Sequence, residues 1–487
     1  MLSNQLELKL SYYSDLYDLV VPKDHILREI KEMVDFSFIY DELENKYCLN
    51  NGRNAKSPIL LFKYLFLKHL YNLSDSGVVE RSMYDLSFKY FLDLTPEESV
   101  IHPSLLTKFR KQRLKDTDFL NLLINKSVEL AIEAGVMNSK TIIIDSTHTE
   151  SRFNKTTKKA LVVQEASKLK EAVTKLMPDT EFPVLENKYA TTETACAYGK
   201  ELLDIIQHSE YSDLPVVKEQ ASLLEEIIAD EIDTYELSTD PDARIGHKST
   251  SGSFYGYKTH LAMSDDRIIT AAIVTSGESF DGNKLPELVE KTRSNGVSVD
   301  TVVADTAYST IENLQEAKEK NFSLVSKLNP CITKGNRPED EFYFNKDADT
   351  MQCPAGHLAI KKHYEKRNKK NDRIKYCFDI ESCKTCPKRH GCYKNGAKTK
   401  TYSVTIKSHY HEEQEAFQKT ENFKEVTKCR YKIEAKNSEL KNIHGYDRCE
   451  SAGITSLEIQ GAVSIYVVNL KRILKLKGIL CPFPEES

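Results

Sequence analysis

The sequence predicts a layered α/β domain, a mixed sheet flanked by helices, that follows an all-helical region. Before Gly135, apolar residues recur with helical spacing. After Gly135, β-branched runs begin, and a hairpin pattern is followed by helix, strand, helix and strand up to Val325. Strands that alternate with helices become parallel neighbours in one sheet, so we expect part of the sheet to be parallel.

The first region contains four well-marked helices. Ser57-Pro58 starts the run ILLFKYLFLKHLYNL, which is apolar on nearly all faces and therefore predicts a buried helix. A second helix is expected from Ser74 through Met83 to Leu94, and a third is expected to be capped by Ser104. The fourth runs from Asp118 to Ala134, where Gly135 ends it in a left-handed conformation.

The later elements follow from their composition. Thr141–Ile144 reads as a buried strand that ends at Asp145, and SFYGYKTHLAMSDDRIITAAIVTS reads as a hairpin. Two helices close the chain, the first holding Glu434 and the second ending at Gly478. We expect a helical N-terminal domain at 1–135, a catalytic domain at 136–478 and a tail at 479–487, with a helical insertion at 151–240 and a cysteine-rich basic insertion at 331–400.

Composition indicates an intracellular enzyme. The chain has 487 residues and a formal net charge of -5, which argues against a protein that coats nucleic acid along its length. The start, MLSNQLELKLSYYSDLYDLV, lacks the apolar core of a signal peptide, and the densest apolar stretch, 59–73, is shorter than the ~20 residues of a membrane helix. Eleven cysteines, an odd number, favour a reducing compartment. We expect a cytoplasmic protein with no membrane association.

Three carboxylates are the candidate catalytic residues. Asp145 and Asp305 each follow a strand-like apolar run, TIIID and TVVAD, and Glu434 lies far downstream in RYKIEAKNSELK. Acids at the ends of adjacent strands meet at one sheet edge and can hold two Mg²⁺ ions roughly 4 Å apart for phosphodiester chemistry. Each aspartate taken alone has a simpler interpretation as the cap of a turn or helix. This interpretation is less favoured because two such motifs occur in one chain.

Helical geometry selects the third acid. At roughly 100° per residue, Val426, Ile433 and Leu440 form one apolar stripe. Glu434 borders this stripe beside Arg430 and Lys441, whereas Glu439 points to solvent. The alternative is an intrahelical ladder of ion pairs with no catalytic role.

These motifs together resemble the bacterial insertion-sequence transposases of the DDE class, in the branch with a helical N-terminal domain and a cysteine-bearing insertion. The resemblance covers nearly the whole chain. It is carried by several separated motifs in one order: KDHILREIKEMVDFSFI, NGRNAKSPILLFKYLFLKHLYNLSD, SLLTKFRKQRL, TIIIDSTHTE, DPDARIGHKS, FYGYKTHLAMSDD, VVADTAYST, RYKIEAKNSELKNIHGYDRCESAG and VVNLKRILKLKG.

The resemblance implies an RNase H-like catalytic domain in which Asp145, Asp305 and Glu434 bind two Mg²⁺ (or Mn²⁺) ions. Such an enzyme cuts double-stranded DNA at element ends and joins the 3'-hydroxyl to target DNA, as a homodimer on DNA and in association with the nucleoid. Arg430, Glu434 and Lys441 match the R-x3-E-x6-K signature of the class and imply DNA contact by the two cations. Three residues before the arginine of this signature a tyrosine is common, whereas this chain has Thr427. Since the resemblance implies that this tyrosine positions DNA, the departure affects the handling of DNA ends and not the metal site.

A basic run closes the helical region. Lys108, Arg110, Lys111 and Arg113 lie within six residues. The run fits either contact with the DNA backbone or a solvated helix face.

Cysteines cluster in the second insertion. Cys353, Cys383, Cys386 and Cys392 include one CxxC pair and supply enough thiolates for a structural Zn²⁺ site, with Cys377 to spare. Free thiols are the alternative, because only one half-site has CxxC spacing. The same segment is rich in lysine, which fits either DNA-backbone contact or a flexible charged loop.

Two other functions remain open. One is an inactive transposase-derived protein that binds DNA, which Thr427 and the acidic net charge favour and the intact acid triad opposes. The other is an RNase H-like nuclease that hydrolyses DNA without strand transfer.

Overall fold

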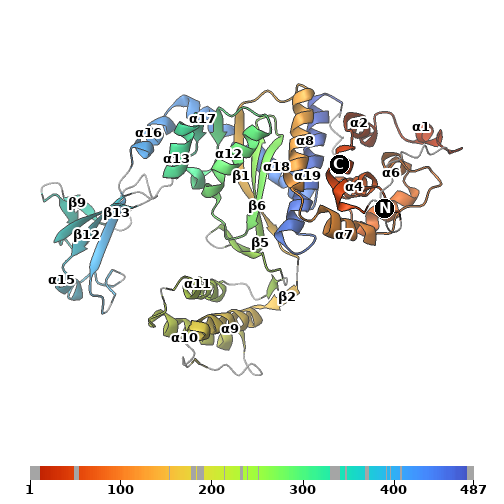
Figure 1. Ribbon diagram of the computed structural model, residues 1–487. Coiled ribbons are helices and arrows are strands. Elements are labelled where there is room, and N and C mark those ends of the chain that lie inside the picture. Colours follow the sequence, from red (N-terminus) through yellow and green to blue (C-terminus); the bar gives the residue numbers. More distant parts are fainter. Residues whose placement is uncertain are drawn as a thin grey trace, which may run out of the picture.

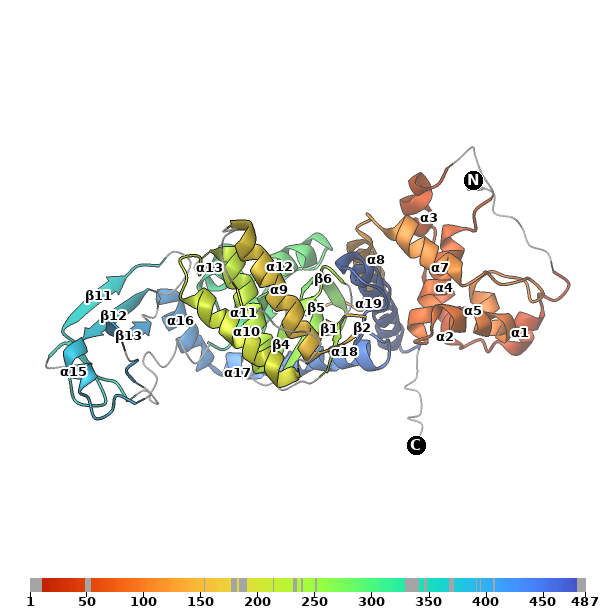
Figure 2. The same ribbon diagram turned by 90° about the horizontal axis from the view of Figure 1, so that it is seen from below.

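The computed structural model of the chain is elongated, with three parts along its length (Figures 1 and 2). N-terminal helices lie at one end, a mixed sheet lies in the middle, and a small β-rich module lies at the other end. The structure describes residues 11–48, 54–152, 154–176, 182–183, 191–212, 214–230, 234–237, 240–249, 252–328, 341–345, 348–367, 372–390, 392–394, 396–405 and 408–479. Most of the expected tail, 480–487, and residues 329–340 at the start of the second insertion lie outside these ranges.

The N-terminal region is helical, as its apolar spacing predicts. The expected single helix from Ser74 to Leu94 is wrong, because the Asp85 side chain accepts from the backbone N–H groups of Ser87 and Phe88 and starts a new helix there. Ser104 is the first helical residue rather than the cap. The elements are α1 (Leu16–Val20), α2 (Ile26–Met33), α3 (Phe38–Leu43), η1 (Glu44–Lys46), α4 (Pro58–Leu70), α5 (Asp75–Tyr84), α6 (Leu86–Phe91), α7 (Ser104–Phe109), the π-helical turn η2 (Arg110–Leu114) and α8 (Phe119–Glu133).

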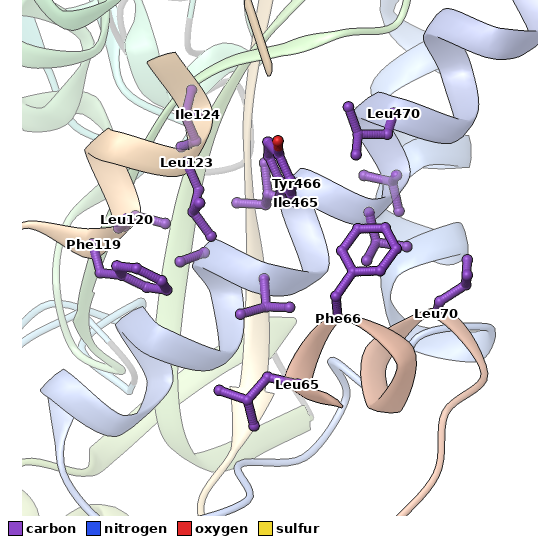
Figure 3. Packing of buried hydrophobic residues seen from close by; sticks show 14 of the residues in the cluster. Leu65, Phe66, Leu70, Phe119, Leu120, Leu123, Ile124, Ile465, Tyr466 and Leu470 are labelled. Carbon is purple, nitrogen blue, oxygen red and sulfur yellow. The ribbon is translucent and has the colours of Figure 1, made fainter. Parts of the chain in front are cut away.

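The main apolar core joins this region to the C-terminus. Helix α4 is buried on nearly all sides, as predicted, and it packs with α8 and with α19 (Ile454–Leu476) (Figure 3). Phe66 and Tyr466 meet edge to face, with ring centroids 6.2 Å apart. Because α19 contacts both α4 and α8 of the N-terminal region and also a strand of the central sheet, it holds the N-terminal helices against the sheet.

The central sheet is mixed and has helices on both faces. Its order is β4-β5-β1-β7-β8, and β6 pairs with β5. As predicted, β1, β7 and β8 are parallel, and β5 and β6 form an antiparallel hairpin. One face packs on α12 and α13, and the other packs on α8 and α19. The elements are β1 (Thr141–Glu150), β4 (Arg244–Ser249), β5 (Gly252–Ser264), β6 (Ile269–Ser276), η3 (Asp281–Lys284), α12 (Leu285–Ser294), β7 (Thr301–Val303), η4 (Thr306–Tyr308), α13 (Ile311–Glu319) and β8 (Ser323–Val325).

The first insertion forms a three-helix arm below the sheet in Figure 1, made of α9 (Lys158–Leu176), α10 (Thr192–Gln207) and α11 (Pro215–Ala229). Leu169, Leu202 and Leu224 are fully buried between the helices, so the arm has a core of its own. A two-stranded ribbon connects it to the sheet, with β2 (Asn154–Thr157) antiparallel to β3 (Thr234–Leu237).

The second insertion forms the part we call the Cys-rich module, residues 341–405 as described. In β12, Ile374, Tyr376 and Phe378 alternate with more polar residues and face a small core. Its elements are β9 (Tyr343–Asn345), β10 (Thr350–Gln352), β11 (Lys361–Glu365), β12 (Arg373–Phe378), α15 (Ile380–Lys384) and β13 (Lys400–Thr405).

Helices complete the chain: α16 (His409–Gln418), α17 (Glu421–Thr427), η6 (Lys428–Arg430), α18 (Tyr431–Asn442) and α19. Gly478 follows α19 with φ 72°, which matches the predicted end. Among the helices in the described ranges, none is both long and apolar enough to cross a membrane.

Candidate active site

Asp145 and Asp305 each lie two residues beyond the last register pair that joins the neighbouring parallel strands β1 and β7. The register pairs Ile143 of β1 with Val303 of β7, and two further residues along each chain lead to Asp145 and Asp305. Ile143 and Val303 both face the side of the sheet covered by α8 and α19. The side chains two residues later leave the strands on that same side. The sheet therefore presents the two carboxyl groups together.

The strand that carries Asp145 is longer than expected. β1 continues to Glu150, because its antiparallel pairing with β5 extends to Gly256 after the parallel pairing with β7 has ended. Asp145 is therefore inside the strand, not at its tip, although it lies just past the end of β7. Asp305 accepts from the backbone N–H of Ala307 at 2.8 Å, so its interpretation as a turn cap also holds.

Glu434 lies on α18, which packs beside β1. Its Oε1 accepts from the Arg430 guanidinium at 2.5 Å, and its side chain is 54% exposed. The exposure expected from the helical wheel is wrong, because Glu439 is only 27% exposed and pairs with the buried Lys436. The wheel considered this helix alone, whereas α18 also packs against α19, whose Lys471 lies near Glu439.

The three acids influence one another electrostatically. Burial raises the pKa of Asp145 to about 6, with further upward contributions from Asp305 and Glu434 that the Arg430 guanidinium opposes. Burial also raises the pKa of Asp305, against the Ala307 N–H and Arg430. Within the described residues, no three His, Cys, Asp or Glu side chains are arranged to hold a metal ion. The acids thus share one region without forming a closed coordination shell.

Two polar residues of this region escaped the sequence analysis. Asn437 donates from Nδ2 to Oδ2 of Asp145 at 3.1 Å, and its Oδ1 is buried without a hydrogen-bond partner. Helical spacing could have indicated it, because Asn437 is three residues after Glu434 and so lies near the same face of α18.

Asp281 is the other missed residue. It accepts from Ser146 Oγ at 2.8 Å and from Lys258 Nζ at 2.9 Å, and it contributes to the raised pKa of Asp305. Asp281 follows a glycine-containing segment rather than an apolar strand, so no pattern in the sequence singled it out.

The predicted DNA-binding cations divide into two groups. Arg430 and Lys441 flank Glu434 on α18, with Lys441 Nζ 3.2 Å from His148 Nδ1. Among the other four, Lys108 and Lys111 are exposed. Arg110 binds Asp75 through both guanidinium nitrogens, and Arg113 donates to the Lys46 carbonyl and lies over the Tyr47 ring, so these two arginines stabilise the helical region.

The four candidate zinc ligands lie around one small pocket of the Cys-rich module. Cys353, Cys383, Cys386 and Cys392 line a cavity of about 40 Å³ together with His357. Burial raises the pKa of the Cys383 thiol, and the other three cysteines raise it further. The described thiols are near one another, but they are not arranged as a ligand set.

Comparison with known families identifies the chain. Residues 14–112 match the family described as a transposase domain (DUF772), and residues 352–474 match the family described as a transposase DDE domain. The second match includes Arg430, Glu434 and Lys441 and begins after Asp145 and Asp305. Among curated proteins, none matches the chain. The two domain matches support an insertion-sequence transposase of the DDE class.

Proposed function

We propose that this transposase cuts phosphodiester bonds at the ends of its element and joins the freed 3'-hydroxyl to target DNA, with Asp145, Asp305 and Glu434 as catalytic residues of an RNase H-like domain. The observation that carries the proposal is that Asp145 and Asp305 each follow the last register pair of the adjacent parallel strands β1 and β7 by two residues, with α18 packed against β1 and Asn437 of α18 bound to Asp145. This arrangement unites residues from three distant parts of the sequence.

The donor atoms fit hard divalent cations. Three carboxylates and the unpartnered Oδ1 of Asn437 are oxygen donors, the type that Mg²⁺ and Mn²⁺ prefer. Asp145, Asp305 and Glu434 would hold two such ions, which when bound polarise the phosphodiester and activate the attacking oxygen. Glu434 would have to exchange its contact with Arg430 for the metal, a small rearrangement for a side chain that is 54% exposed.

The chain's own groups provide orientation. Asn437 holds one oxygen of Asp145, which limits the directions that this carboxylate can adopt. Arg430, released from Glu434, would place a guanidinium beside the acids, and Lys441 lies farther along α18. Both cations suit phosphate oxygens of a bound DNA strand.

The remaining parts have roles in handling DNA. We propose residues 1–135 as a DNA-binding domain, with the exposed Lys108 and Lys111 at its surface, and 136–478 as the catalytic domain with two insertions. Two element ends must be handled together, which favours a homodimer on DNA. Zn²⁺ binding by Cys353, Cys383, Cys386 and Cys392 is a prediction that metal analysis of the purified chain tests. A zinc content far below one ion per chain would remove it.

The decisive experiment is Mg²⁺-dependent cleavage of a duplex that carries the terminal sequences of the element. The unaltered chain should cut this duplex and transfer the strand, and Asp305→Ala should do neither. Asp300→Ala is the matched control, because Asp300 is 62% exposed and pairs only at the surface with Lys140. Cleavage without strand transfer would indicate a nuclease. Binding without cleavage by the unaltered chain would indicate an inactive DNA-binding relative.

A further inference from the structure

The Cys-rich module concentrates positive charge in a chain that is acidic overall. Residues 361–400 contain 14 lysines and arginines against four aspartates and glutamates, whereas the whole chain has a formal net charge of -5. Like charges gathered so densely repel one another and are retained at no gain in folding stability. A segregated positive surface of this kind suits a polyanionic partner.

The three-stranded sheet β11-β12-β13 has one covered face and one open face. On the covered face, Tyr376 and Phe378 are buried against Phe342 and Met351. Residues directly opposite each other in an antiparallel pair lie on the same face, and the faces alternate along each strand. Lys375 and Cys377, the two neighbours of Tyr376 in β12, therefore point to the open face, as does Arg373.

The register places cations in neighbouring rows of this open face. Lys361 is opposite Cys377, His363 is opposite Lys375, and Glu365 is opposite Arg373. Lys361 and His363 are exposed, and the side chains of Lys375 and Arg373 are 35% and 36% exposed. β13 adds the hydroxyl groups of Thr401 and Ser403 beside Cys377 and Lys375.

The open face contains one acid among these cations. Glu365 pairs with Arg373 and lies 3.8 Å from Lys375 Nζ, so its charge is shared between two cations. Residues two apart along a strand are roughly 6.6 Å apart, a spacing comparable to that of successive phosphates on one DNA strand. The hydroxyl groups add uncharged donors to phosphate oxygens.

We propose that this open face binds the sugar-phosphate backbone of double-stranded DNA. The identity of the polyanion rests on the proposed function, because DNA is the substrate of a transposase. The module lies at the end of the molecule opposite the N-terminal helices (Figures 1 and 2), so it contacts DNA at a place separate from that region. The contact is independent of base sequence, because it consists of point charges and hydroxyl groups on a flat sheet.

The test uses the full chain with Lys361, Arg373 and Lys375 all changed to glutamine. Binding to a mixed-sequence duplex is measured by fluorescence anisotropy between 50 and 200 mM KCl, without divalent ions. If each of these three cations neutralises one phosphate, the slope of log K against log salt becomes shallower by ~2.7. The control changes Lys168, Lys200 and Lys218, exposed lysines of the three-helix arm, and should keep the slope of the unaltered chain. Equal slopes for the two triple variants would overturn the proposal.

A gain-of-binding variant provides a second readout. Glu365→Gln removes the acid of the open face, so it should tighten duplex binding and steepen the salt dependence, with an unchanged melting temperature as the check on folding. Weaker or unchanged duplex binding by Glu365→Gln contradicts the proposal. The proposal is also contradicted if the triple variant of the open face loses binding to duplex RNA but keeps its binding to duplex DNA. If the unaltered chain fails to cut DNA but the two variants change the salt slope as expected, the DNA-binding surface is supported and the proposed catalytic function is not.

Discussion

Lys68 of α4 donates to Glu450 with Nζ 2.6 Å from Oε2, although the two residues are 382 positions apart. Lys68 also binds Asp75 at 2.8 Å, and Asp75 binds Arg110. Glu450 lies in the segment between α18, which carries Glu434, and α19. This buried ionic cluster fastens the helical region to the chain segment that follows the candidate catalytic helix.

Replacing Lys68 by methionine should lower the free energy of unfolding by ~3 kcal/mol, because two carboxylates would remain buried with fewer counter-charges. Urea denaturation of the full chain measures the change. Lys126→Met serves as the control, since Lys126 pairs with Glu129 at the surface and its loss should cost less than ~1 kcal/mol. Equal losses in the two variants would show that the cluster contributes nothing beyond an exposed pair.

The buried histidines His69 and His444 should make stability fall as the pH drops from 6.5 toward 4. Burial lowers the pKa of His69 and of His444 to about 4, from an ordinary value of 6.5. In this window the unfolded chain binds protons that the folded chain does not, so acidification favours unfolding. Melting temperatures at pH 7 and pH 5 should differ less in His444→Gln than in the unaltered chain. The exposed His208, changed to glutamine, should leave that difference as it is.

Asp145→Asn should stabilise the chain at pH 8 while it abolishes cleavage. Burial raises the pKa of Asp145 to about 6, so its contribution to stability is complete below the ordinary value of 3.8 and is lost as the pH rises through 6. At pH 8 the ionised carboxylate therefore costs ~2–3 kcal/mol, which asparagine avoids. Urea denaturation without divalent ions should show the gain, and Mg²⁺ should stabilise only the unaltered chain. Asp300→Asn should change stability by less than ~0.5 kcal/mol. A destabilised Asp145→Asn would mean that the carboxylate makes an essential structural contact.

Asn437→Ala should reduce cleavage ~10–100-fold and raise the Mg²⁺ concentration needed for half-maximal rate, because the orientation of Asp145 is lost. Cleavage rates across a Mg²⁺ titration provide the measurement. Asn442→Ala is matched to it, since Asn442 is an exposed residue of the same helix and contacts only Ser438 among the described residues. An unchanged Mg²⁺ requirement together with a lower rate would restrict Asn437 to a structural role.

Local patterns predicted much of this fold because they depend on neighbouring residues. The spacing of apolar residues in α4 and α19, the hairpin of β5 and β6, and the positive φ at Gly135 all agree with the sequence analysis. The break at Asp85 and the partial burial of Glu439 were missed. At Asp85 a side-chain cap interrupts a smooth periodicity, and at Glu439 the packing of α18 against α19 covers a position that the helix alone would expose.

The sequence by itself determined which acids are candidates, since Asp145 and Asp305 follow apolar runs that become parallel strands. Only the tertiary structure decided which groups from distant segments surround them: Asn437 donates to Asp145, and Asp281 accepts from Ser146. It also decided that Arg110 is bound to Asp75 inside the protein rather than exposed like Lys108. The physical reason is that strand register follows from local residue patterns, whereas hydrogen bonds and ion pairs between distant segments depend on how the helices pack against the sheet.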